Sequence, residues 1–461
     1  MKYLNVHGKL LSVPSFFQVY NFGGGAADKY REIVYADLTD DTPALFNYYY
    51  LEYGKFGKIW LKNLHNYNLI SDFLNSVRYD MITNKNYISK QYEPKKYDFG
   101  KKVFLLDSGA SNLIKQIGQV VDFNEEKFYE LFLKFMKAYY DFADKYKFDI
   151  VIGFDLGGKY TYKDGEADQR LINFYNHLDK DKINICILEE SIKYIQNKKS
   201  YYPYILATIH GETPEKYEKY TRKILYLESK YHFHFWGFAL GGIASTKNLN
   251  ASWFKGIDYN RTGVKSVKNA TLPAVGTKIV YNLVGNRPIH ALGCGGYPNI
   301  PMNYFFGATS FDAASPARRA GDGNKKSVER VYDKYCAVSG FSKIFVGGYR
   351  KNIDKYTLYS NDIGYINLNK VDDNFPLCGC MACKEISSYK DIKDLYHEKL
   401  NNKDEEFYFA RQLMNIHAIW QHRFLCNVIS KYRTMEEFVN NNPNQLFQKL
   451  LIIYNQVLNL Y

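Results

Sequence analysis

The chain has 461 residues, of which 46% are hydrophobic and 17% aromatic, so it can bury a large core and is not a disordered chain. Its length suits one large domain with insertions, or two domains. Lys and Arg outnumber Asp and Glu by 61 − 48 = 13. This excess favours a polyanionic partner such as nucleic acid, although a Lys-rich surface encoded by an AT-rich genome would produce the same excess.

The opening residues MKYLNVHGKL lack the apolar segment of a signal peptide, and no apolar run approaches the roughly 20 residues that cross a bilayer. We therefore expect a soluble protein in a reducing cytoplasm, either that of its own cell or that of a phage-infected host. Disulfides are rare in such a compartment, and clustered cysteines there point to a metal. Three of the seven cysteines are clustered within 378–383.

The first clear strand signal is VFLLDSGA (103–110), an apolar run that ends at the carboxylate of Asp107. A helix signal follows near 125–146, and Asn124 can serve as its N-cap. Five apolar residues recur there at helical spacing and predict the buried face of the helix: Phe128, Leu131, Phe135, Tyr139 and Phe142.

Two further strand signals also end at chemically active side chains. The run in FDIVIGFDLGG reaches Asp155, and the run in PYILATIH reaches His210. After the second run, Thr213 and Pro214 occupy the N-cap and the first position of another predicted helix.

Three more strands are predicted over FHFWGFALGG (233–242), PIHALGCGG (288–296) and GATSFDAASPARR (307–319), the last of which contains Asp312. Alternating strands and helices imply a parallel sheet covered by helices. A doubly wound sheet and a (β/α)8 barrel both fit this pattern. We favour the α/β fold of a (β/α)8, or TIM, barrel, because at least five predicted strands end in residues that could serve a function. In a barrel, the residues at the carboxyl ends of all strands lie around one rim, whereas an open sheet brings such residues together at one switch point.

We expect the barrel to occupy residues 1–370 and to be completed by C-terminal helices. A zinc-binding subdomain is expected at 371–430 and a helical tail at 431–461, where Thr434 and Glu437 predict a capping box. The glycine-rich segments fit neither the G-x-G-x-x-G dinucleotide motif nor a phosphate-binding P-loop.

The zinc prediction rests on CGCMAC, whose three thiol groups suit tetrahedral Zn²⁺. A fourth ligand should come from the helix predicted over 404–428, in which His417 shares a face with apolar residues. His422 lies roughly 140° further round that helix and is expected to point elsewhere, and His397 is the alternative ligand. Four protein ligands would leave no open position on the metal, so we expect a structural zinc held by Cys378, Cys380, Cys383 and His417.

In their order and spacing, these motifs resemble those of the tRNA-guanine transglycosylases and their DNA-acting 7-deazaguanine transglycosylase relatives, which are zinc-containing (β/α)8 barrels. The resemblance runs from NVHGKLLSVPSFF to about residue 430. LLDSGASN is similar to the family's D-S-G-G-F-Q segment, DIVIGFD to the strand that reads guanine, and GATSFDAASPARR to the segment with the nucleophile. C-x-C-x-x-C followed by N-x-I-H is similar to the family's zinc site.

The resemblance implies a role for each acidic tip. Asp312 would be the nucleophile, Asp107 the general acid and base, and Asp155 the residue that reads the guanine edge. Any one of these acids alone could equally cap a following helix, but three on separate tips favour a site. The other implied positions bind the nucleic acid (Arg318 and Arg319) or the substrate base: Ser108, His210, Gly241, Gly242 and Ile243.

Two departures from the family pattern bear on the polynucleotide. Ala110, Ser111 and Asn112 replace Gly-Phe-Gln, and Ala317 interrupts Pro-Thr-Arg. These positions contact the base and the anticodon loop in the tRNA enzymes, and we expect no further RNA-binding module after the zinc site. The favoured reaction is therefore exchange of guanine in DNA for a 7-deazaguanine, such as the 7-cyano or 7-aminomethyl form. The same reaction on tRNA is the alternative.

Two other readings stay open. A non-catalytic partner subunit is disfavoured because Asp107 and Asp312 are retained, and a zinc hydrolase is disfavoured if protein fills all four zinc positions. The sequence leaves the oligomeric state open, although members of the family commonly form dimers.

Overall fold

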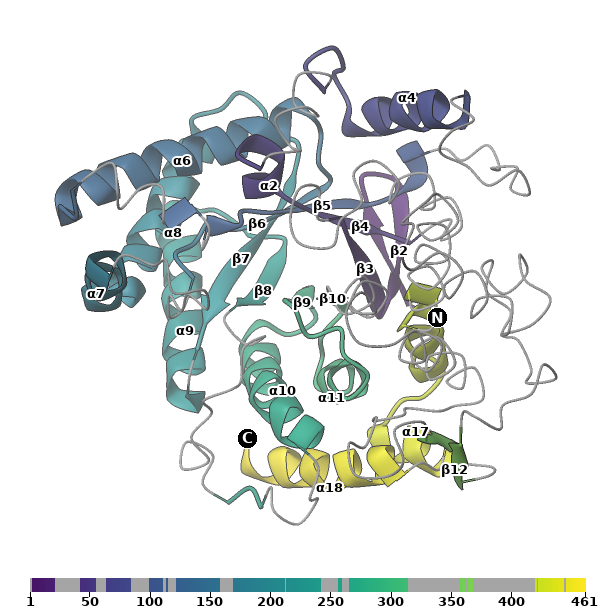
Figure 1. Ribbon diagram of the computed structural model, residues 1–461. Helices are drawn as coiled ribbons and strands as arrows, with labels where there is room; N and C mark the ends of the chain where they lie inside the picture. The colour runs from purple at the N-terminus through teal and green to yellow at the C-terminus, as the bar shows by residue number, and fades with distance from the viewer. Residues whose placement is uncertain are drawn as a thin grey trace.

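A closed barrel of eight parallel strands forms the centre of the protein (Figure 1), as the sequence predicts. Neighbouring strands follow one another in the chain, and the last pairs with the first to close the ring. The strands are β3 (Ser15–Tyr20), β4 (Ala44–Asn47), β5 (Phe104–Asp107), β6 (Ile150–Ile152), β7 (Tyr204–His210), β8 (Gly237–Gly241), β9 (Ile289–Ala291) and β10 (Ser310–Ala313).

The computed structural model describes most of the barrel and its helices but not the whole chain. Its described residues are 2–20, 42–54, 64–83, 99–110, 113–114, 122–157, 169–211, 213–241, 256–258, 265–313, 357–360, 364–367, 419–420, 422–442 and 445–461.

Helices cover the outside of the barrel (Figure 1). The long ones, α6 (Glu125–Lys145), α8 (Lys180–Gln196), α9 (Pro214–Tyr231) and α10 (Lys265–Val284), pack against strands or against each other in chain order. Shorter helices precede, separate or follow them in the chain: α2 (Tyr48–Glu52), α4 (Ile70–Thr83), η2 (Phe99–Lys101), α7 (Gln169–His177) and α11 (Asn299–Tyr304). This is the arrangement that alternating strand and helix signals require.

The α6 and α9 helices begin where the capping residues predict. Asn124 accepts a hydrogen bond from the Lys127 backbone N–H, and Thr213 accepts one from that of Lys216. On α6, Phe128, Tyr139 and Phe142 are buried as expected, whereas Leu131 and Phe135 are only partly buried. The buried face turns toward Phe132 and Met136 instead. Its Tyr139 hydroxyl bonds to the carbonyls of Leu106 (2.7 Å) and Ile152 (2.8 Å), so this helix ties together the ends of β5 and β6.

A β-hairpin of β1 (Lys2–Val6) and β2 (Lys9–Val13) precedes the barrel. Its Val6 and Leu11 belong to the same buried cluster as Phe17, Leu105 and Ile150, whose strands line the barrel. The hairpin therefore contributes to the inner core and lies where the chain enters the barrel, at the amino ends of the strands.

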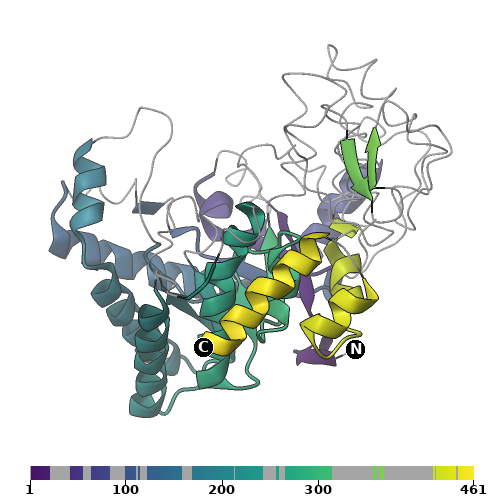
Figure 2. The same cartoon turned by 90° about the horizontal axis from the view of Figure 1, so that it is seen from below.

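The C-terminal tail is helical, as predicted, and forms α17 (Met435–Asn441) and α18 (Gln445–Leu460). Thr434 caps α17 through the Glu437 N–H, as the predicted capping box requires. The Glu437 carboxylate, however, accepts from the Arg433 N–H, one residue before the N-cap N–H that a capping box uses. The α18 helix packs against α10, so the tail is part of the helical layer around the barrel (Figure 2). A further hairpin pairs β11 (Thr357–Ser360) with β12 (Gly364–Asn367).

Among the helices that the structure describes, none is both long and apolar enough to span a membrane.

Candidate active site

Three aspartates lie at the carboxyl ends of barrel strands. Asp107 is the last residue of β5, Asp155 lies three residues after the end of β6, and Asp312 is in the last half of β10. The carboxyl ends of parallel strands meet at one rim of a barrel. The three side chains are close enough that the charges of Asp155 and Asp312 both raise the pKa of Asp107. The structure thus brings together the three acids that the sequence singles out.

Asp107 is the carboxyl group most strongly perturbed at this rim. Burial is the main cause, and the two neighbouring carboxylates add to it, raising the pKa of Asp107 from 3.8 to about 7. The backbone N–H groups of Gly109 and Ser108 act in the opposite direction. At neutral pH the group therefore exchanges its proton readily, as a general acid or base must.

Asn47, at the end of β4, orients the Asp107 carboxyl group. Its Nδ2 donates to Asp107 Oδ2 at 3.0 Å, while its Oδ1 accepts from the Tyr50 N–H at the start of α2. The second bond fixes which end of the amide faces the acid. Gly109, with φ of +62°, lies so close to this amide that a Cβ atom there would be 2.3 Å from Asn47 Oδ1.

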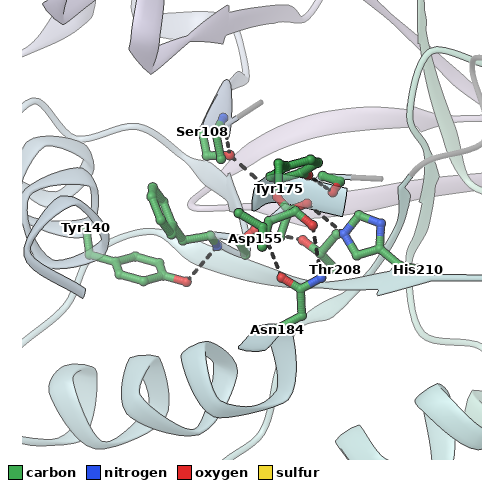
Figure 3. Close-up of polar contacts among 12 residues, drawn as sticks. Ser108, Tyr140, Asp155, Tyr175, Asn184, Thr208 and His210 are labelled. Atoms are coloured by element: carbon green, nitrogen blue, oxygen red, sulfur yellow. Dashed lines mark hydrogen bonds and ion pairs between the residues drawn. The ribbon is translucent and has the colours of Figure 1, made fainter. Parts of the chain in front are cut away.

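Asp155 forms a close pair with His210 from the neighbouring strand (Figure 3). His210 Nε2 lies 2.6 Å from Asp155 Oδ2, and the Ser108 hydroxyl lies 3.5 Å from Oδ1. The side chains of the pair are only 14% and 16% exposed. Gly241 lets the imidazole approach the backbone of β8, since a Cβ atom there would lie 2.8 Å from His210 Cε1.

The backbone after Asp155 is held by side chains of the outer helices (Figure 3). Asn184 of α8 accepts from the Leu156 N–H (2.6 Å) and donates to the Leu156 carbonyl (3.0 Å). Tyr175 of α7 donates to the carbonyl of Gly157. Asn184 is a buried polar residue on a helix face that otherwise packs apolar side chains and Ser191, and the sequence does not single it out.

Asp312 is held on one oxygen. Its Oδ1 accepts from the Gly293 N–H at 2.6 Å and lies 3.3 Å from His290 Nε2. His290 is buried in β9, and its Nδ1 lies 2.8 Å from the Ser310 hydroxyl. The sequence predicts the strand and its glycine-rich tip but does not single out this histidine.

Cys294 lies beside Asp312 but is not a nucleophile of the usual thiolate kind. Burial, with the Asp312 charge as a smaller cause, holds the pKa of its thiol well above the usual value. Among the described residues around Asp312, the carboxylate is therefore a better candidate nucleophile than this thiol.

Several predicted site residues lie outside the described residues. They are the base-binding Gly242 and Ile243, the nucleic-acid-binding Arg318 and Arg319, and the zinc ligands Cys378, Cys380, Cys383 and His417. Within the described ranges, no group of three or more His, Cys, Asp or Glu side chains is arranged to hold a metal ion.

His422, expected to point away from the apolar stripe of its helix, is itself fully buried. Its ring lies 4.6 Å from those of Phe16 and Tyr297. Leu425, Cys426 and Ile429 are buried at helical spacing from it, whereas Phe424 and Val428 of the predicted stripe are only partly buried. The expectation for His422 is therefore wrong, because this helix buries a different face from the one that the sequence predicts.

Comparison with known proteins gave no match: no protein-family model fits the chain, and no curated protein matches its sequence.

Proposed function

We propose that this protein is a guanine transglycosylase, which exchanges guanine in DNA for a 7-deazaguanine base by double displacement. The observation that carries the proposal is the Asp107 carboxyl group, whose pKa is raised to about 7 beside Asp312 and Asp155 at one rim of the barrel. Base exchange needs a nucleophile, a proton donor and an acceptor for the purine edge, and three carboxyl groups at one rim supply all three.

In the first displacement, a carboxylate oxygen of Asp312 bonds to C1′ of the nucleoside while the bond from C1′ to N9 breaks. The departing guanine takes the electron pair of that bond and a proton from Asp107. A carboxylate suits this step, because it stabilises the positive charge that develops on the sugar and then forms the covalent intermediate.

In the second displacement, the incoming base gives its N9 proton to the Asp107 carboxylate, and N9 displaces Asp312 from C1′. Two inversions restore the original configuration of the sugar carbon. Asp107 thus acts as acid and then as base, as microscopic reversibility requires.

Asp155 would accept hydrogen bonds from guanine N1–H and the exocyclic amine. Adenine has no hydrogen on N1 and no amine at C2, so it could donate neither of these hydrogen bonds to Asp155. The contacts of the Asp155 carboxylate with His210 and Ser108 hold it in place for this role. A base inside a duplex cannot reach such a site, so the substrate must be single-stranded or the base must be flipped out.

DNA is favoured over tRNA by the sequence around the site. Ala110, Ser111, Asn112 and Ala317 replace the residues that contact base and anticodon loop in the tRNA enzymes. The excess of 61 basic over 48 acidic residues suits either polymer. Exchange in tRNA is the second candidate, on the strength of the family resemblance alone.

The proposal includes a structural zinc, which rests on the cysteine motif. One zinc ion per chain should bind to Cys378, Cys380, Cys383 and His417. Elemental analysis of purified protein tests this. His417→Ala should lose the metal and His397→Ala should keep it, and the reverse result would transfer the fourth position to His397.

Incorporation of labelled guanine tests the reaction. The protein should transfer label into guanine-containing DNA and leave bulk tRNA unlabelled, while Asp312→Asn should transfer none. Label that enters tRNA and never DNA would overturn the choice of polymer. If folded, zinc-loaded protein labels neither with guanine or a 7-deazaguanine, a non-catalytic partner subunit becomes the better description.

A further inference from the structure

Ser310, His290 and Asp312 form a buried chain of hydrogen bonds beneath the rim. The Ser310 hydroxyl lies 2.8 Å from His290 Nδ1, and His290 Nε2 lies 3.3 Å from Asp312 Oδ1. The three residues are 6%, 1% and 8% exposed. Bulk water therefore cannot replace these bonds, and each polar atom depends on its protein partner.

The partners decide where the imidazole proton lies. An ionised carboxylate only accepts hydrogen bonds, so the Nε2 that faces Asp312 must carry hydrogen. With one ring proton, Nδ1 is then an acceptor, and the Ser310 hydroxyl donates to it. The edge of the imidazole also meets the Phe17 ring, at a centroid distance of 5.5 Å and an angle of 90°, which restricts rotation of the ring.

Within the described part of the chain, both hydrogen bonds to the Asp312 side chain end on the same oxygen. Gly293 N–H reaches Oδ1 at 2.6 Å, from a turn in which Gly293 has φ of +67°. The Asp312 main chain is fixed too, since its carbonyl accepts from the Gly295 N–H at 2.7 Å. The carboxylate is therefore held by Oδ1, and no described residue forms a hydrogen bond to Oδ2.

We propose that His290 is a positioning residue for the nucleophile: with the Gly293 N–H it holds Asp312 Oδ1, so that Oδ2 is the atom that bonds to C1′. This inference rests on the proposed function for the identity of the reaction. Oδ2 donates the electron pair that forms the bond to C1′, the purine leaves with the pair of the old bond, and Asp107 supplies its proton. His290 keeps its proton throughout and touches no reacting atom.

Two amide variants separate a positioning role from a merely structural one. The amide nitrogen of His290→Gln can replace Nε2 and still donate to Asp312, whereas that of His290→Asn can replace only Nδ1. In a single turnover with guanine-containing DNA, His290→Gln should form the covalent adduct within about threefold of the wild-type rate. His290→Asn should be about 10- to 100-fold slower, the loss expected for one hydrogen bond to a charged group.

The apparent affinity for DNA should be the same in both variants, because His290 does not face the substrate. Ser310→Ala should slow adduct formation by no more than about threefold, since Asp312 alone already requires hydrogen on Nε2. Equal losses in the Gln and Asn variants, or a loss in neither, would overturn the proposal.

The nitrogen NMR signals of His290 test the geometry without any activity. In ¹⁵N-histidine-labelled wild-type protein, His290 should be the Nε2–H tautomer, and its Nε2 signal should shift in Asp312→Ala. A ring with hydrogen on Nδ1 alone would overturn the positioning role even if exchange occurs. If the tautomer is as expected but the wild-type protein exchanges no base, the reaction is wrong and the hydrogen-bond chain stands.

Discussion

The two ends of the barrel each contain an aspartate that burial perturbs, but the charges beside these two aspartates have opposite signs. At the amino end, Asp149 precedes β6 and is fully buried, yet Lys9 of the hairpin lies 2.8 Å from its Oδ2. The Phe104 N–H (2.7 Å) and the Tyr202 hydroxyl (3.2 Å) also bond to it. At the carboxyl end, the charges of two further carboxylates among the described residues, Asp155 and Asp312, act on Asp107.

The difference distinguishes an aspartate in an ion pair from the aspartate to which we assign an acid and base role. Burial raises the pKa of Asp149, but Lys9 is the main opposing influence and makes the acid a partner in an ion pair. The neighbours of Asp107 instead add to the effect of burial. Placing like charges together costs stability, and proteins do so mainly where a perturbed group is needed for chemistry.

The largest expected effect comes from removing the acid at the functional end. Asp107→Asn cannot protonate the leaving guanine, and its turnover should fall by about 10²- to 10⁴-fold. In the wild-type protein, guanine release in a single turnover should slow as pH rises through about 7, because the protonated form is required. Rapid-quench measurement across pH 5.5–9, roughly spanning that value, checks both, and an unchanged pH profile in Asp107→Asn would remove its acid role.

Breaking the ion pair at the structural end should affect folding instead. Lys9→Met leaves Asp149 buried without its cation, which should lower the free energy of unfolding by about 3–5 kcal/mol. Urea denaturation measures this. Lys2→Met, an exposed site on the same hairpin, is the matched control and should change little. Equally small decreases in the free energy of unfolding of the two variants would show that the ion pair between Lys9 and Asp149 does not stabilise the amino end of the barrel.

Asp107→Asn should also stabilise the fold, with a definite pH dependence. The folded-state pKa of about 7 lies above the ordinary 3.8, so wild-type stability falls as pH rises between these values. Because the carboxyl group keeps some exposure, the gain in the variant should be on the order of 1–3 kcal/mol above pH 7 and should vanish below pH 4. Denaturation curves at several pH values check the sign, and a variant less stable than wild type at pH 8 would contradict the unfavourable setting of Asp107.

A change remote from both ends should give the smallest effect. Thr434→Ala removes the N-cap of α17 and should cost about 1 kcal/mol of stability without altering base exchange. Thr434→Ser keeps the hydroxyl and should recover most of that loss. Thermal denaturation of the wild-type protein and the two variants measures these differences in stability. A changed rate of base exchange in Thr434→Ala would contradict the expectation that the C-terminal tail does not affect the site.

The sequence predicts local features of this fold better than pairings between distant segments. Apolar runs and capping residues identify six barrel strands and the starts of α6, α9 and α17. They do not identify β3 and β4, because these short runs end without a charged residue like Asp107 and lie among many aromatic residues.

The same limit applies to the site. Asp107, Asp155 and Asp312 stand out because each interrupts or ends an apolar run. The partners that hold them do not: Asn47 is 60 residues from Asp107 and His290 is 22 from Asp312. Such contacts depend on which strand ends meet at the rim, and this is known only once the barrel has closed.

The central claim is that Asp312 attacks the sugar of a guanine nucleotide in DNA, and mapping the covalent adduct tests it most directly. The protein is mixed with guanine-containing single-stranded DNA, quenched with denaturant, and digested for mass spectrometry. The account predicts a nucleotide-bearing peptide that contains Asp312, and no adduct in Asp312→Asn. An adduct on another residue, or one that persists in Asp312→Asn, would contradict it.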